Sequence, residues 1–249
     1  MKDLPIPKRQ KLIKEKSEIL KLKIDYNSLY YSSRKQSILF TIYKIMMVEK
    51  TISEFLSSEY KEFAMYVIEG RAIPSVIDGF KPTQRKIIHI SNQTWKTGSE
   101  KTLKVFQLSG KVASDCYYHH GDASLSNAII TMAQRFKNNA PLLEEDGQFG
   151  SLRSPQAGAP RYIGTKLNEN FKLLYKDSEL LEFKEEEGEQ IEPKFFLPII
   201  PTVLINGSSG IAVGFASNIL NRDVKSIIEC CQKILSDKKI SEVKPSLVG

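Results

Sequence analysis

Stretches of apolar periodicity alternate along the chain with sequence rich in glycine and proline. Over residues 47–70 apolar side chains recur at helical spacing, which predicts a helical arm that ends at Gly70. Pro74 and the Asp78-Gly79 pair then predict a loop. The first folded region is therefore expected to begin with a helix and a sharp turn.

Three short helices are expected after this loop. Pro82 suits the first turn of one helix, and a second is predicted over Leu103 to Cys116. The third, LSNAIITMAQRF, follows Asp122 and Ser124, either of which can cap it. Three short helices in succession resemble a helix-turn-helix core.

The second half of the chain changes pattern twice. After Pro141 the sequence EEDGQFGSLRSPQAGAPRYI favours a β wing with loops, because its glycines and prolines exclude a long helix. From Phe195 the run FFLPIIPTVLINGSSGIAVGFAS mixes short β-like stretches with glycine turns, and VKSIIECCQKIL predicts a short amphipathic helix. We expect an α/β (α+β) chain, a winged-helix domain followed by the start of a second α/β domain. The expected segments are a basic extension (1–46), a helical arm (47–70), a winged-helix domain (71–192) and the second domain (193–249).

Charge is distributed unevenly along the 249 residues, whose net charge is +7. Residues 1–50 hold 12 Lys/Arg and 5 Asp/Glu, so the rest of the chain, with 24 of each, is neutral. Residues 71–172 are again basic, with 14 Lys/Arg against 8 Asp/Glu, whereas the stretch Asp177 to Glu192 is acidic. This polarity fits a face that binds a polyanion and a solvated face turned away from it, although many basic domains bind no nucleic acid.

Several classes of protein are excluded by composition. The three cysteines have neither CxxC nor zinc spacing, and we expect buried or idle thiols in a reducing compartment. The charged N-terminus predicts no signal peptide, and the apolar run Ile38 to Val48 is too short to span a bilayer. We expect a cytoplasmic protein that does not interact with a membrane.

The pair Arg161-Tyr162 in APRYIGTKL is a candidate for covalent catalysis. A tyrosine oxygen can attack phosphorus if it loses its proton, and a neighbouring guanidinium can stabilise the charge that develops on the phosphate oxygens. An Arg-Tyr pair in a loop is more often a packing tyrosine beside a surface arginine, so the dipeptide alone leaves both interpretations open.

Other candidates for contact with an anion precede a helix. His119 and His120 in YHHGD could bind phosphate or transfer protons, or could simply satisfy their own loop. Arg71, Lys81, Arg85 and Lys86 could line a path of phosphates, or could form an ordinary exposed helix face.

The run INGSSGIAVG holds an isolated apolar residue, Ile211, among glycines. It lacks the GK[ST] of a Walker motif. The run is either a set of plain β turns or a wedge that places an apolar side chain between base pairs and kinks the duplex.

Five motifs in order resemble the DNA breakage-reunion region of type IIA DNA topoisomerases: RAIPSVIDGFKPTQRKI, YYHHGDAS, DGQFGS, GAPRYI and IPTVLINGSSGIAVGFAS. This family includes gyrase A, topoisomerase IV and the eukaryotic enzymes, and the resemblance covers roughly residues 51–245. The contiguous His119-His120 is similar to the eukaryotic and phage forms. The pattern looks most like the medium subunit of T4-like phage enzymes.

The resemblance implies a role for each candidate. Tyr162 would be the nucleophile that holds the 5′ end of a cut strand, and Arg161 would stabilise the transition state. The other implied contacts with double-stranded DNA are Arg71, Lys81, Arg85, Lys86, His119, His120 and, as an intercalating wedge, Ile211.

The resemblance also implies partners, because the acidic Toprim metal site of the family has no counterpart among these motifs. Mg²⁺ would be held, and ATP hydrolysed, by a partner ATPase–Toprim chain, and two copies of this chain would act as a homodimer within a hetero-oligomer. The second domain resembles the beginning of the family's tower domain, which would make the sequence truncated. The alternatives are a non-catalytic winged-helix DNA-binding module and a scaffold fragment of such a complex.

Overall fold

The computed structural model describes residues 51–96, 101–240 and 242–246. The expected basic extension (1–46) and the first four residues of the expected arm lie outside the described residues. The chain forms two compact units, residues 1–58 and 59–249. All candidate site residues belong to the second unit. The expected domain boundaries at residues 70/71 and 192/193 stay predictions.

Residues 52–72 are helical, as the periodicity predicts. In the first unit Thr51 caps helix α3 (Ile52–Phe55) through a capping box with Glu54. A π-helical turn η2 (Leu56–Tyr60) follows, and in the second unit helix α4 (Lys61–Val67) continues into a second π-helical turn, η3 (Ile68–Ala72). The helix therefore runs past Gly70, where we expected it to end. The Ile73 amide still donates to the Ile68 carbonyl at 3.1 Å, and Pro74, which has no amide hydrogen, comes next.

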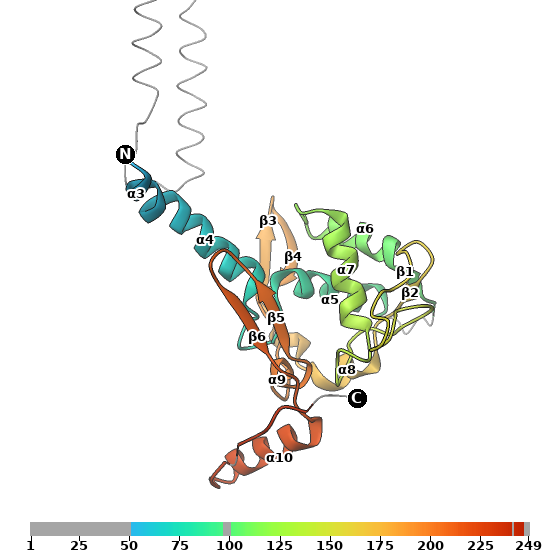
Figure 1. The fold of residues 1–249 in the computed structure, drawn as a ribbon. Helices are drawn as coiled ribbons and strands as arrows, with labels where there is room; N and C mark the ends of the chain where they lie inside the picture. The colour runs from blue at the N-terminus through green and yellow to red at the C-terminus, as the bar shows by residue number, and fades with distance from the viewer. Residues whose placement is uncertain (1–50, 97–100, 241, 247–249) are drawn as a thin grey trace, which may run out of the picture. The chain divides into compact units, whose positions relative to one another are not determined.

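Helices α5 (Pro82–Thr94), α6 (Val105–Asp115) and α7 (Asp122–Ala133) pack against one another (Figure 1). They surround a shared apolar core. The three predicted helices are therefore present. The second one begins at Val105 instead of Leu103, because the preceding two residues form a strand. Asp122 and Ser124 lie inside the third helix, and Gly121 occupies the cap position. The fully buried side chains of this core include Ile87, Ile88, Val105, Leu108, Val112, Leu125 and Ile129.

In the described part of the chain the strands pair as three separate antiparallel two-stranded sheets. Strand β1 (Leu103–Lys104) pairs with β2 (Gly164–Thr165), β3 (Phe183–Glu186) with β4 (Glu189–Pro193), and β5 (Ser208–Ile211) with β6 (Ala216–Ile219). The mixture of helices and strands agrees with the expected class. The winged-helix assignment itself stays a prediction.

The same hydrophobic core continues around helix α8 (Glu169–Leu174), where it is aromatic. Phe80 stacks on Tyr175 with ring centroids 5.4 Å apart, and Phe171 stacks on the other side at 5.0 Å. Phe196 meets these rings edge-on. A 3₁₀ turn, η4 (Ser178–Leu180), then leads to the β3–β4 hairpin.

The described residues after Phe196 include two helices. The segment TVLIN, which we expected to be β-like, is the short helix α9 (Thr202–Asn206), so that expectation is wrong. Thr202 and Ile205, three residues apart, are both buried, which fits helical and not strand spacing. Helix α10 (Val224–Leu235) is the predicted amphipathic helix; its Asp223 cap accepts from the Ser226 amide, and it packs on α9. No helix within the described ranges is long and apolar enough to cross a membrane.

Asp78 joins helix α5 to the aromatic part of the core. Its carboxylate accepts two hydrogen bonds from the Arg85 guanidinium, at 2.7 and 3.0 Å, and one from the Phe196 amide at 3.1 Å. Its backbone carbonyl accepts from the Tyr175 and Thr202 hydroxyls. Gly79 follows with a φ of +73°, and a Cβ there would lie 2.8 Å from the Val203 backbone nitrogen. This turn therefore fixes the start of α5 against α8 and α9.

Candidate functional site

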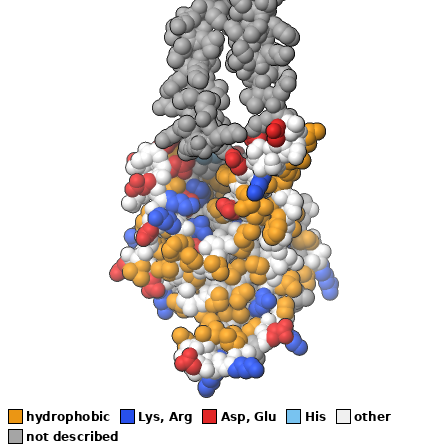
Figure 2. Space-filling model, turned by 90° about the vertical axis from the view of Figure 1, so that its left-hand side faces the viewer, with side chains coloured by type: hydrophobic (Ala, Val, Ile, Leu, Met, Phe, Trp, Pro, Cys, Tyr) orange, Lys and Arg blue, Asp and Glu red, His pale blue; other side chains and the backbone are white. Residues whose placement is uncertain are grey.

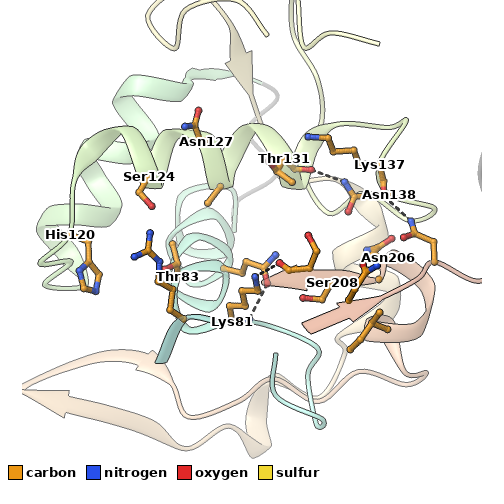
Figure 3. A pocket seen from close by; sticks show the side chains of 18 of the residues that line it. Lys81, Thr83, His120, Ser124, Asn127, Thr131, Lys137, Asn138, Asn206 and Ser208 are labelled. Carbon is orange, nitrogen blue, oxygen red and sulfur yellow. Dashed lines mark hydrogen bonds between the residues drawn. The ribbon is translucent and has the colours of Figure 1, made fainter. Parts of the chain in front are cut away.

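A groove of about 1140 Å³ runs between α7 and the segments that begin α5 and end α9. Figure 3 shows His120, Ser124, Asn127 and Thr131 along the α7 side, with Lys81, Thr83 and Ser208 facing them. Of the residues singled out in the sequence, the structure brings Arg71, Lys81, His119 and His120 together at this groove. They come from η3, the α5 cap and the loop before α7.

Three cationic side chains line the groove: Arg71, Lys81 and Lys137. Arg71 is exposed, and Lys81 is half-buried. The Lys81 ammonium donates to the Ser209 carbonyl at 2.5 Å. Burial, together with the nearby Arg71 guanidinium, lowers the pKa of Lys81. Two like charges held close together in a hollow favour an anionic ligand, which would relieve their repulsion.

The structure does not support phosphate contacts by Arg85 and Lys86, which sequence reasoning grouped with Arg71 and Lys81. The Arg85 side chain is buried in its ion pair with Asp78. The Lys86 ammonium donates to the Cys116 carbonyl and to Glu192, which is itself buried. Both cations point inward because α5 turns this face toward the core, so their charges hold the fold together.

His119 and His120 are exposed at the mouth of the groove. His120 packs edge-on against Tyr118, with ring centroids 5.2 Å apart. His119 Nε2 lies 3.4 Å from a carboxylate oxygen of Glu186 at the end of β3. We expected the acidic stretch to lie on a face turned away from the basic one. This expectation is wrong for Glu186, which reaches the histidine loop.

Tyr162 lies on a tight turn beside α6. Its amide donates to the Ala159 carbonyl at 2.9 Å, and its side chain is 72% exposed. The next residue, Ile163, is buried in the core. The turn thus presents the phenol to solvent while the following side chain anchors the backbone. Tyr162 is not among the residues that line the groove.

Arg161 is exposed next to this phenol. Its guanidinium carbon lies 5.9 Å from the centroid of the Tyr162 ring, within the range of a cation–π contact. A cation this close to the ring could also reach an anion that approaches the phenol oxygen. Two sequence neighbours thus form a spatial pair that could act on a phosphate.

Ile211 ends strand β5 and is 85% exposed. The hairpin β5–β6 packs against η3, and Gly210 is required at the contact: a Cβ there would lie 2.2 Å from the Ala72 carbonyl oxygen. The Ser217 hydroxyl donates to the same carbonyl at 3.0 Å. Figure 2 shows hydrophobic side chains spread over the middle of the face on this side of the molecule. Ile211 has the exposure that a wedge needs.

The described residues do not fit a resident metal ion, since no three His, Cys, Asp or Glu side chains among them cluster as ligands would. Cys116 is buried, and burial, with Glu192 nearby, raises the pKa of its thiol to about 12. Cys230 and Cys231 are free and half-buried on α10. The expectation that Mg²⁺ is held elsewhere stays a prediction.

Sequence reasoning missed the polar lining of the groove, the lysine Lys137 that also lines it, and one cation near the tyrosine. Ser124, Asn127 and Thr131 follow one another at helical spacing on α7, a signal that was present in the sequence. Lys104, whose ammonium donates to the Tyr162 carbonyl at 2.8 Å, is 58 residues away in sequence and carried no signal.

Comparison with known proteins shows the family to which this chain belongs. The sequence profile of the family described as the A subunits of DNA gyrase and topoisomerase IV matches residues 71–248. The medium subunit of DNA topoisomerase from Enterobacteria phage T4 is 41% identical over 195 residues, which is 78% of this chain and 44% of that protein. DNA topoisomerase 2 from Arabidopsis thaliana is 40% identical over 201 residues, 78% of this chain and 13% of that protein.

A solved structure gives the same result for the fold. The DNA-binding, cleavage and re-ligation domain of Plasmodium falciparum topoisomerase II superposes with a TM-score of 0.69 at 37% identity. The match covers 77% of this chain and 26% of that one. The chain thus spans less than half the length of each of these relatives.

Proposed function

Because the chain belongs to the family of DNA gyrase and topoisomerase IV A subunits, we propose that it is the DNA cleavage and religation subunit of a type IIA topoisomerase. The observation that supports this most directly is the exposed Tyr162 with Arg161 beside its ring, in the same compact unit as the cationic groove. In the alternative, a non-catalytic DNA-binding module, the exposed phenol would only contact the duplex.

The proposed reaction is a transesterification. The Tyr162 oxygen loses its proton and attacks the scissile phosphorus, so that a bond to the 5′ phosphate forms while the bond to the 3′ oxygen breaks and that oxygen gains a proton. Arg161 stabilises the additional negative charge on the phosphate oxygens. One phosphodiester replaces another, and the reverse reaction reseals the strand without an external energy source.

Arg71, Lys81, His119 and His120 would hold the phosphates of the duplex in the groove, without reading its sequence. Ile211 would enter between base pairs and bend the DNA. Mg²⁺ and ATP would belong to a partner ATPase–Toprim chain, and two copies of this chain would cut opposite strands. These assignments extend from the family and from the placement of the residues.

The direct test is to mix the chain with its Toprim-bearing partner, Mg²⁺ and supercoiled DNA, and to stop the reaction with denaturant. We expect the chain to become covalently attached to the 5′ ends of cleaved DNA. A mixture that binds DNA and leaves every strand free of protein would favour the non-catalytic alternative.

Arg71→Ala should weaken binding to duplex DNA without a preference for sequence. Losing one phosphate contact should raise Kd by about 3- to 10-fold and make the slope of log K against log salt shallower by about 0.9. Fluorescence anisotropy over a salt series measures both quantities. Lys176→Ala, which removes an exposed cation that does not line the groove, is the matched control and should change neither.

Ile211→Ala should reduce the bend in bound DNA. Unstacking a base step requires a few kcal/mol, which a methyl group cannot offset as a larger wedge does. Energy transfer between dyes at the two ends of a short duplex should fall toward the value for straight DNA. Ile199→Ala, at another exposed isoleucine outside the hairpin, should give the same energy transfer as the unaltered chain. Equal bending by both variants would contradict the wedge.

A further inference from the structure

We propose that Lys104 is a positioning residue that holds the backbone of the nucleophile turn and thereby aims the Tyr162 side chain. The inference rests on the proposed function. The ammonium of Lys104 donates to the Tyr162 carbonyl at 2.8 Å, although the two residues are far apart in sequence. Lys104 is exposed, and it immediately precedes α6.

The start of α6 contributes two more donors to the same turn. The Val105 amide donates to the Ile163 carbonyl and the Phe106 amide to the Pro160 carbonyl, both at 3.1 Å. First-turn amides of a helix have no partner within the helix, so these bonds satisfy groups that would otherwise need water. Three carbonyls of one short turn are thus held by three consecutive residues.

Lys104 is itself fixed in place. Its amide donates to the Gln107 side chain at 3.0 Å, and its strand β1 pairs with β2 just after the turn, with Lys104 opposite Gly164. These three hydrogen bonds, which we call the clamp, join the start of α6 to both sides of Tyr162. Among its three donors, only the lysine ammonium belongs to a side chain and can be removed by substitution.

The chemical consequence follows from where the lysine acts. The Tyr162 carbonyl belongs to the residue whose phenol must lie in line with the breaking bond. A shift of about 1 Å in such a group slows a reaction by about 100-fold. Because the other two bonds of the clamp are backbone bonds to its neighbours, loss of the lysine contact should let the Tyr162 backbone rotate while the fold persists.

The test compares Lys104→Met with Lys111→Met in the full chain with its Toprim-bearing partner, Mg²⁺ and a defined duplex. Lys111 is an exposed lysine on the same helix, paired only with Asp115 among the partners that the structure shows. We expect Lys104→Met to slow single-turnover cleavage by about 10- to 100-fold relative to Lys111→Met. The DNA Kd and Tm of the two variants should agree within 2-fold and a few degrees.

Two readouts separate positioning from a general structural role. Religation should slow by the same factor as cleavage, which leaves the fraction of covalent complex at equilibrium unchanged, because both directions pass through one geometry. Lys104→Arg, which keeps a donor at this place, should restore most of the rate. Equal cleavage rates for Lys104→Met and Lys111→Met, or no recovery with arginine, would overturn the inference alone. Absence of adduct in the unaltered chain would overturn the proposed function and the inference with it.

Discussion

Tyr162→Phe is expected to form no covalent complex with DNA while binding it as well as the unaltered chain does. The substitution removes only the phenol oxygen, the atom proposed to attack phosphorus. Because the side chain is 72% exposed and the turn is held through its backbone groups, loss of this hydroxyl should not change the stability of the fold. Adduct trapped by denaturant should fall to background, and Kd should stay within about 2-fold, as expected for loss of one exposed hydroxyl.

The matched control is Tyr66→Phe, at another well-exposed tyrosine on α4, which should form adduct at the normal rate. A Tyr162→Phe chain that still becomes attached to DNA would assign the nucleophile to a different residue. Loss of DNA binding in the same variant would instead show that Tyr162 serves to grip the duplex. The two results are separable because binding and attachment are measured independently.

Asp78→Ala is expected to be the most destabilising single change described for this chain. Asp78 is fully buried, and its removal leaves the buried Arg85 guanidinium without its ion pair and the Phe196 amide without an acceptor. Breaking a buried pair by removing one partner costs about 3–5 kcal/mol. For a unit of this size that lowers Tm by roughly 10 °C, which calorimetry on the full chain can measure.

Asp115→Ala provides the comparison, because it removes the same side chain from an exposed pair with Lys111. Its effect should be below about 1 kcal/mol. The double variant Asp78→Leu/Arg85→Met should regain part of the lost stability, since no buried charge then remains unpaired. If Asp78→Ala and Asp115→Ala unfold at the same temperature, Asp78 does not have the joining role assigned to it.

The sequence predicts the helical elements of this chain well. Pro82 begins α5 where its fixed φ suits a helix, and the apolar spacing of VKSIIECCQKIL corresponds to α10. The failure at α9 has a physical reason. A five-residue segment between proline and glycine is too short for periodicity to separate helix from strand. The contacts that hold it as a helix, such as those of Thr202 with Asp78 and of Asn206 with Ala140, form only in the folded chain.

The candidate site could be predicted only in part, because charge in a sequence does not reveal its direction. Arg71 and Arg85 look alike in the motif, yet Arg71 reaches the groove and Arg85 is buried in an ion pair with Asp78. The same limit applies to Glu186, which a count of charges placed on the opposite face from the His119 it contacts. Lys104 has a partner that only the folded chain brings near.

The close contact between Gly210 and Ala72 has a mechanical consequence. The segment that carries Arg71 and the hairpin that carries Ile211 touch through main-chain atoms, which cannot yield as a flexible side chain would. The Arg71 segment and the Ile211 hairpin should therefore move together. A duplex that resists bending at Ile211 would then also strain the phosphate contacts in the groove. If the proposed function holds, the protein would stay bound to DNA with flexible base steps longer than to DNA with stiff ones, without contacting base edges.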